Sequence, residues 1–379
     1  MNTRLGVSAD DMEVADAIGR YALTELAPYA QAVDEQEIST VRYVPALAEL
    51  GVMGMNLPEQ WGGPGISPTA LILSLVEIAR HCAATASMIG AHYLATDSIL
   101  IGGDDDIRSR YLPDAASGRR LGAFALTEPR AGSNPADMAT RAERRGDHYR
   151  LTGVKHFISN AGEADFIVVY AKTDAAAGHR GISAFVVDKA TPGLSISSPE
   201  KLMGIRGGHA FEVALDCDVP VSNRLGEEGS GFRTAMKVLD NSRLDVAASS
   251  IGIAQAALDA AISWSKQRLV GGEPLAAKQG IQWKLADMKL RLEAAWALTL
   301  QATAKRANGE KFSLESSMAK LYASEAAGFI TDEALQIHGG YGFTREMPLE
   351  RYARDARIMR IYEGSSEIQR TVIARLILA

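Results

Sequence analysis

The sequence predicts an α+β protein in which a helical domain, a β-domain and a second helical domain follow one another. Apolar residues recur with helical spacing up to about residue 118, and the same spacing returns after Gly229. Between them, from 121 to about 226, short β-branched runs alternate with turn residues. No alternation of strands and helices is visible, so a doubly wound dinucleotide-binding fold is not expected. We place the domains at 1–120, 121–229 and 230–379.

Composition excludes several classes of function. The net charge is −6 and the chain carries no basic run, which argues against nucleic acid as a partner. No apolar run reaches the length of a membrane span, and the acidic N-terminal region is unlike a targeting peptide. Cys82 and Cys217 lie far apart without metal-like spacing and are typical of core thiols. We therefore expect a cytoplasmic protein with no membrane segment and no metal site.

The first domain is predicted to be entirely helical. Ser8 has the features of a helix N-cap, and apolar residues follow it at helical spacing over 12–26. A short helix is predicted over 41–50. A longer helical region covers 69–101, with a break near 81–85.

The middle domain contains strand candidates at 148–152, 166–170 and 182–187. Clusters of Gly, Asn, Asp and Pro separate them, as is typical of short connections between strands. A small barrel or sandwich is the expected architecture.

The last domain shows three long stretches of helical periodicity, at 232–262, 281–300 and 314–335. Three or four antiparallel helices of this length predict a bundle.

One acidic residue near the C-terminus is a candidate catalytic group. Glu363 lies between Tyr362 and Gly364, and a capping-box spacing from Ser366 to Gln369 follows. Glu363 is thus expected on a tight turn just before a helix, where Gly364 can adopt a backbone conformation that other residues resist. A partly desolvated carboxylate there is suited to removing a proton. Locally, the same pattern is equally that of an acidic residue favoured by a helix dipole.

Three further motifs are suited to binding a phosphate or a flat ring. The stretch 336–342 closes a helix and exposes three glycines, which can approach a phosphate or simply form a helix C-cap. Hydroxyls and amides in 126–133 can contact the polar edge of a heterocycle, although a turn explains them as well. In a regular strand, Phe157 and Ser159 share one face, so Phe157 can cover a ring while Ser159 bonds to its rim.

Taken together, these motifs resemble the acyl-CoA dehydrogenase family along essentially the whole chain. Seven segments match the family's motifs in its order and spacing. They are Thr127–Ser133, Phe157–Asn160, Lys201–Gly207 with Leu225–Phe232, Gln336–Gly342, Arg351–Ile358 and Ile361–Arg370. The resemblance implies N-terminal helices, a middle β-domain and a C-terminal four-helix bundle, assembled as a homotetramer. It also implies an FAD cofactor, an acyl-CoA substrate and electron-transferring flavoprotein as the redox partner.

The resemblance also assigns site residues. Those expected at the flavin and its phosphates are Phe124, Leu126, Thr127, Ser133, Phe157, Ser159, Ser365 and Glu367. Those expected at the adenine and pyrophosphate half of a neighbouring subunit's FAD are Arg268, Gln279, Gln336, Ile337, His338, Gly339 and Gly340. Those expected at the substrate are Ser133, Asp240, Arg243 and Gly364.

Glu363 matches the catalytic base of the family's short- and medium-chain branches. Other branches carry a base near Asn241 and Ser242, and these two positions themselves hold no carboxylate in this chain. The expected reaction is oxidation of an acyl-CoA to the trans-2-enoyl-CoA, with Glu363 removing the α-proton and flavin N5 accepting the hydride. Alternatives on the same scaffold are an acyl-CoA oxidase or a monooxygenase-like relative that uses oxygen, and a non-catalytic flavoprotein.

Three positions depart from the family pattern. Gly271 replaces a common aromatic residue beside the adenine, Asn134 replaces Asp, and Ser365 replaces Thr. The acyl group itself is poorly determined. The stretch from Cys82 to Leu94, which resembles the acyl-pocket helix, contains no Arg or Lys to pair with a dicarboxylic acyl chain. Its small residues leave room for a bulky or branched chain.

Overall fold

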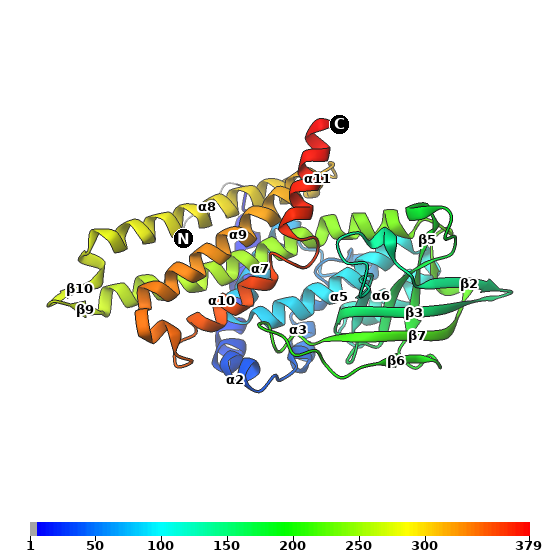
Figure 1. Cartoon of the computed structure of the whole chain (residues 1–379), viewed down its shortest axis with the longest axis horizontal. Helices are drawn as coiled ribbons and strands as arrows, with labels where there is room; N and C mark the ends of the chain where they lie inside the picture. Colours follow the sequence, from blue (N-terminus) through cyan, green and yellow to red (C-terminus); the bar gives the residue numbers. More distant parts are fainter. Residues whose placement is uncertain (1–5) are drawn as a thin grey trace.

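The computed structural model describes residues 6–379. The molecule is elongated, with the β-sheet at one end and the long C-terminal helices extending away from it, as Figure 1 shows. The N-terminal helices pack along α7, so the helical domains share one apolar core. The predicted order of helical, β and helical regions is confirmed.

The N-terminal region begins with a capping box at Ser8. The Ser8 hydroxyl accepts a hydrogen bond from the Asp11 amide at 3.1 Å, and the Asp11 carboxylate accepts one from the Ser8 amide at 2.9 Å. The predicted break in the long apolar stretch falls at Cys82, whose backbone is extended. The region contains α1 (Ala9–Tyr21), α2 (Ala30–Glu35), α3 (Val44–Glu49), α4 (Pro68–His81), α5 (Ala83–Gly102) and α6 (Asp105–Ala116).

The middle region forms one eight-stranded sheet in the order β6-β7-β3-β2-β4-β5-β8, with β1 parallel to β4. Alternate residues of β4 enter two different cores. Phe166 and Val168 pack towards α5 and α6, whereas Ile167 and Val169 pack against strands β3 and β7. The sheet therefore folds over on itself around an apolar interior. Its strands are β1 (Gly122–Ala125), β2 (Arg141–Arg145), β3 (His148–Ser159), β4 (Phe166–Lys172), β5 (Ile182–Asp188), β6 (Leu194–Ile196), β7 (Ala210–Pro220) and β8 (Arg224–Leu225).

The C-terminal region is a helical bundle built around α7. This helix spans 37 residues and packs most extensively on α9 and α4. The expectation that no apolar run reaches membrane length is wrong for α7, which is long and apolar enough to span a bilayer. About two thirds of its most apolar stretch is buried, as befits a core helix. The region contains α7 (Gly231–Gln267), α8 (Gln279–Ala307), α9 (Ser313–His338), α10 (Leu349–Ile358) and α11 (Ser366–Leu378).

A small hairpin of β9 (Leu269–Val270) and β10 (Glu273–Pro274) joins α7 to α8. Its two-residue turn consists of Gly271 and Gly272, with φ of +63° and +82°. A two-residue turn with positive φ at both positions favours glycine strongly. The turn therefore explains why Gly271 stands where the family pattern has an aromatic residue.

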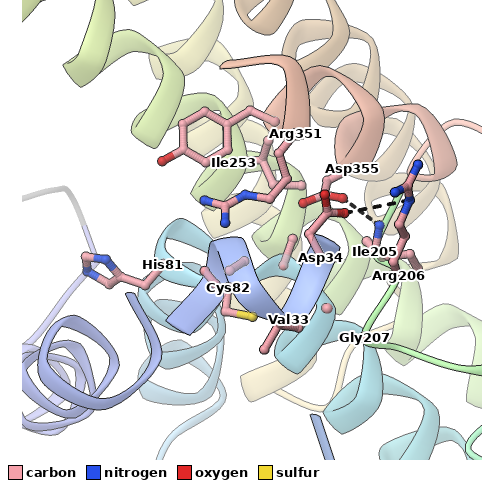
Figure 2. Close-up of a pocket in the computed structure, with 15 residues that line it drawn as sticks. Val33, Asp34, His81, Cys82, Ile205, Arg206, Gly207, Ile253, Arg351 and Asp355 are labelled. Carbon is pink, nitrogen blue, oxygen red and sulfur yellow. Dashed lines mark hydrogen bonds and ion pairs between the residues drawn. The ribbon is translucent and has the colours of Figure 1, made fainter. Parts of the chain in front are cut away.

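A cluster of ion pairs joins the three regions. Arg354 of α10 donates two hydrogen bonds to Asp34 of α2, at 2.8 and 2.6 Å, and one to the Met203 carbonyl oxygen at 3.0 Å. The next residue, Asp355, accepts a hydrogen bond from the Ile205 amide. Figure 2 shows Asp34 and Asp355 side by side, facing Ile205 and Arg206. The cluster thus connects the N-terminal helices, a loop of the β-domain and the C-terminal bundle.

Replacing Arg354 with Ala leaves Asp34, which is 5 % exposed, without its bidentate partner. Arg206 remains 3.9 Å from Asp34, but loss of the bidentate partner of a buried carboxylate is costly, so we expect a loss of about 3 kcal/mol of stability. Thermal unfolding followed by circular dichroism measures the change. Arg119→Ala is the matched control, since its partner Asp114 and its own side chain are both exposed. Equal midpoints for the two variants would contradict the role of the cluster.

Candidate active site

The turn that carries Glu363 lies between α10 and α11 and has an unusual backbone. Glu363 has φ of +53° and Gly364 has φ of +94°. The N-cap of α11 is Ser365, whose hydroxyl accepts a hydrogen bond from the Ile368 amide at 3.4 Å. The predicted capping box from Ser366 to Gln369 is therefore wrong by one residue. Gln369 instead bonds back to the turn.

Two buried side chains stabilise this turn through hydrogen bonds to its backbone. The Gln369 amide donates to the carbonyl oxygens of Glu363 and Gly364, at 3.2 and 3.0 Å. Lys320 of α9, which is fully buried, donates to the Gly364 carbonyl oxygen at 2.7 Å. These hydrogen bonds satisfy the carbonyl groups of Glu363 and Gly364, which the left-handed backbone directs away from α11. They hold the backbone of the turn that carries Glu363.

The Glu363 carboxyl is desolvated. Its Oε2 atom is buried and has no hydrogen-bond partner in the described part of the chain. Burial raises the pKa of Glu363 from 4.5 to about 7, and a hydrogen bond from Ser242 and the positive charges of Lys320 and Arg243 oppose that rise. A carboxyl with this pKa is available as a base at neutral pH and is a stronger base than an exposed one.

Asp240 and Arg243 lie on α7 beside this turn. They form an ion pair with each other at 2.6 Å, and Arg243 also donates to the Ser317 hydroxyl at 3.3 Å. Asp240 further accepts a hydrogen bond from Ser313. The structure therefore places Arg243 close enough to Glu363 to lower its pKa, while the Asp240 carboxylate is already occupied by protein partners.

The two motifs predicted to contact the flavin are joined by a buried lysine. Lys155 of β3 donates to the Leu126 carbonyl oxygen at 3.0 Å and to Glu128 Oε1 at 2.9 Å. The backbone amide of His156 donates to the Thr127 carbonyl oxygen at 3.0 Å. The loop after β1 and the end of β3 therefore form one surface. Phe124 lies half-buried just before it, and Ser133 is exposed in the same loop.

Phe157 does not occupy a regular strand position. The pairing of β3 with β7 shifts between Lys155 and Ile158, and Phe157 itself has φ of +57°. The simple picture of Phe157 and Ser159 on one face of a regular strand is thus wrong, because a bulge separates them. The bulge leaves the Phe157 side chain 60 % exposed and stacked on His156, with 4.2 Å between ring centroids. An exposed aromatic held in a strained conformation is suited to covering a flat ring.

Hydrogen bonds connect this surface to the turn of Glu363. Asn160, at the end of β3, donates to the Met88 carbonyl oxygen of α5 at 2.9 Å. The neighbouring Ser87 bonds to the Tyr362 hydroxyl, next to Glu363. The structure therefore brings together the motifs predicted to contact the flavin, α5 and the candidate base.

A second cluster forms at the far end of α7. Trp264 stacks on His338, with 5.0 Å between ring centroids, and Tyr341 lies 5.2 Å from Trp264. The Arg268 guanidinium lies over both Trp264 and Tyr341. These residues border an open hollow of about 520 Å³ together with Ile337, Gly339 and Gly340.

The glycines of this hollow have space around them. A side chain added at Gly339 or Gly340 would meet no atom within 4 Å, so a ligand can approach the backbone closely. Gln336 is exposed on the last turn of α9 and Gln279 begins α8, so both can reach the same surface. Trp264 was missed by the sequence analysis. Its position four residues before Arg268, one helical turn away, was the available signal.

The two clusters cannot serve one bound dinucleotide in a single chain. Phe124 and Leu126 pack near Met236 at the start of α7, whereas Trp264 lies near its end. At the rise of an α-helix, these 28 residues span about 42 Å. Of the remaining predicted residues, Ser365 caps α11, and Glu367 is exposed in its first turn. In residues 6–379 no three His, Cys, Asp or Glu side chains are grouped as a metal site would require.

Comparison with family models accounts for nearly the whole chain. Residues 8–119 match the model of the acyl-CoA dehydrogenase N-terminal domain, residues 123–217 that of the middle domain and residues 229–378 that of the C-terminal domain.

Individual relatives agree with these models. Acryloyl-CoA reductase (NADH) of Anaerotignum propionicum is 42 % identical over 359 residues, covering 94 % of this chain and 91 % of that protein. Butyryl-CoA dehydrogenase from Megasphaera elsdenii superposes with a TM-score of 0.97 at 37 % identity, covering all of both chains. A chain from the structure of the electron transferring flavoprotein of Acidaminococcus fermentans also has a TM-score of 0.97 at 37 % identity, covering 99 % of this chain and 100 % of that one.

The raised pKa of Glu363 has a consequence for stability. Folding favours the protonated carboxyl, so this stabilisation is complete below pH 4.5 and is lost as the pH rises through about 7. Glu363→Gln cannot ionise and therefore does not lose this stabilisation. The difference in free energy of unfolding between the variant and the natural protein should shift in favour of the variant by about 2–3 kcal/mol between pH 5 and pH 8. Denaturant unfolding at both pH values measures the gain. Glu367→Gln, an exposed neighbour, should show none, and equal behaviour of the two variants would refute the desolvated state of Glu363.

Proposed function

The chain belongs to the acyl-CoA dehydrogenase family, and from that premise we propose that it converts an acyl-CoA to the trans-2-enoyl-CoA with Glu363 as the base. It is an FAD-dependent oxidoreductase that acts on acyl-CoA. The observation that carries the assignment of the base is the buried, unpartnered Oε2 atom of Glu363, on a turn fixed by Lys320 and Gln369.

In this proposal Glu363 takes the α-proton onto its carboxylate. The α C–H bond is only weakly acidic, so the thioester oxygen must be polarised as negative charge develops there. The backbone N–H of Glu363 is a suitable donor, because no acceptor in residues 6–379 takes a hydrogen bond from it. The bound flavin supplies the acceptor for the hydride from the β-carbon. Burial by the acyl chain would remove water from the carboxylate and strengthen it as a base.

The residues of the two clusters fit an FAD shared between subunits. The bulged Phe157, with Leu126, Thr127 and Ser159, forms a surface for the flavin ring. Arg268 and the open backbone of Gly339 and Gly340 suit the negative pyrophosphate. Trp264 and Tyr341 offer aromatic faces where the Gly271 turn has none. Phe124, Ser133, Gln279, Gln336, Ile337, His338, Ser365 and Glu367 are assigned supporting contacts on the same basis.

This division of the cofactor requires at least two subunits, and we propose a homotetramer. The distance along α7 between the two clusters supports the need for a second copy. Large apolar side chains are exposed on α8, with Trp283 at 63 % and Leu290 at 69 %. Such side chains are typical of surfaces buried between subunits.

Electron-transferring flavoprotein is the proposed redox partner, and an oxidase that uses oxygen is the alternative. The similarity to a chain in an electron transferring flavoprotein structure supports the former. Oxygen consumption that outpaces reduction of an artificial acceptor during acyl-CoA oxidation would select the oxidase instead. The buried, free thiols of Cys82 and Cys217 support the proposed cytoplasmic location.

Glu363→Gln is expected to retain the fold and FAD but to bleach its flavin about 10²–10⁴-fold more slowly when an acyl-CoA is added without oxygen. The reason is that the amide cannot accept the α-proton. Stopped-flow absorbance measures the rate with a panel of thioesters. Glu310→Gln, an exposed change on the loop before α9, is the control. Bleaching at the natural rate in Glu363→Gln would exclude it as the base.

Lys320→Met removes a cation beside Glu363, so the pKa of the base should rise. Glu363 must be ionised to act as the base. The pH at which the rate of flavin bleaching reaches half of its maximum should therefore be higher in the variant than in the natural protein. We expect a loss of roughly tenfold at pH 6 and little change at pH 9.

Lys320→Gln separates the two roles of the lysine, because the amide can still donate to the Gly364 carbonyl oxygen but carries no charge. It should show the same pH shift as Lys320→Met with less loss of thermal stability. Unshifted profiles in both variants would show that Lys320 does not tune the base.

A further inference from the structure

A second buried carboxyl lies close to the candidate base. Asp245 is on α7, three residues after Ser242, which bonds to Glu363. Three residues correspond to about 4.5 Å along the helix axis, or nearly one turn. Asp245 is only 7 % exposed, and its Oδ1 atom is buried without a hydrogen-bond partner in the described residues. A buried, unsatisfied carboxyl oxygen is unusual and calls for a partner that the protein itself does not supply.

The neighbouring carboxyl of Asp97 is also buried, but both of its oxygens have hydrogen-bond partners. Asp97 of α5 is 3 % exposed, and its two oxygens accept hydrogen bonds from the amides of Asn56, at 2.7 Å, and Asn241, at 2.8 Å. Asp97 lies near enough to Asp245 to raise the pKa of Asp245, and the positive charge of Arg306 lowers the pKa of both carboxyls. Two side-chain amides thus donate hydrogen bonds to Asp97, and none in the described residues donates to the Oδ1 atom of Asp245.

The direction expected for the substrate would bring its acyl chain towards Asp245. The large, charged CoA portion must remain in contact with solvent, so the acyl end extends towards the buried side of the site. Along α7, Asp240 has a side chain that is 19 % exposed, whereas Asp245 lies deeper. Asp245 is near enough to Glu363 for the two charges to interact, so a thioester with its α-carbon at Glu363 would extend its next few carbon atoms towards Asp245.

We propose that Asp245 accepts a hydrogen bond from a donor on the acyl chain, a hydroxyl or an ammonium group a few carbons beyond the α-carbon. This proposal rests on the proposed function of Glu363. An unsubstituted hydrocarbon chain would leave the Asp245 oxygen desolvated and unpaired. A site built to bond a polar substituent rejects the analogue that lacks it far more strongly than an apolar pocket rejects an extra hydroxyl. The substrate class is thus a hydroxyacyl or aminoacyl thioester.

The test compares thioesters of equal length on the purified FAD-loaded protein. In 5-hydroxypentanoyl-CoA and 5-aminopentanoyl-CoA a donor occupies the end of the chain, and in hexanoyl-CoA a methyl group replaces it. We expect the natural protein to favour one of the donor-bearing thioesters over hexanoyl-CoA by about 10–100-fold in kcat/KM. The 5-amino thioester should have the higher kcat/KM if Asp245 is ionised, and the 5-hydroxy thioester should have the higher kcat/KM if Asp245 is neutral.

Asp245→Val should reverse that preference, because an apolar side chain of similar size accepts the methyl group and leaves the donor unpaired. Ser250→Ala is the control, since Ser250 is buried on the same helix and bonds only to the Val246 carbonyl oxygen. Dissociation constants in the Glu363→Gln background give a second readout that does not depend on turnover. In that background, Asp245→Val should weaken the binding of the donor-bearing thioester and strengthen the binding of hexanoyl-CoA.

The outcomes separate the two proposals. Flavin bleaching that is equally fast with all three thioesters, and unchanged by Asp245→Val, would overturn the role of Asp245 while leaving the proposed function intact. Bleaching in the natural protein that persists undiminished in Glu363→Gln would instead overturn the proposed base. A reversal of preference in Asp245→Val but not in Ser250→Ala would support the acyl-chain contact.

Discussion

The chemistry of this protein depends on keeping one carboxyl group out of water at a fixed position. Glu363 sits on a left-handed turn that would not persist without support. Lys320 and Gln369 hold the carbonyl groups of that turn, and Lys320 and Arg243 also supply positive charge. Desolvation and positive charge act in opposite directions on the pKa of Glu363, and their balance leaves it near neutrality. A less buried carboxyl would be too weak a base, and one without cations would remain protonated.

The long helix α7 organises everything around that group. Near its start it packs against the surface that we assign to the flavin, and at its far end it presents Trp264 and Arg268. Between them it supplies Ser242 and Arg243 to the base and Asp245 to the proposed acyl subsite. The helix is apolar because most of its faces lie in the core, which is why it has the length and composition of a membrane span.

Much of the architecture follows from periodicity, but the detail of the site does not. Helical spacing located the long helices, and β-branched runs located β3 to β5. The motifs placed Glu363 on a turn before α11, yet the capping residue is Ser365, because Gln369 satisfies the turn and not the helix end. The bulge at Phe157 also escaped prediction, since a strand's register depends on its partner β7. Asp245 carried no local signal, because its burial and lack of a partner arise only when α5 and α7 pack together.

The most direct test of the account follows the α-proton itself. The FAD-loaded protein and its Glu363→Gln variant would be mixed with an acyl-CoA in deuterated water, and deuterium at the α-carbon of recovered thioester measured by mass spectrometry. If Glu363 is the base, the natural protein incorporates solvent deuterium at the α-carbon and the variant does not. Equal incorporation by both proteins would show that another group moves this proton, and the central role of Glu363 would fail.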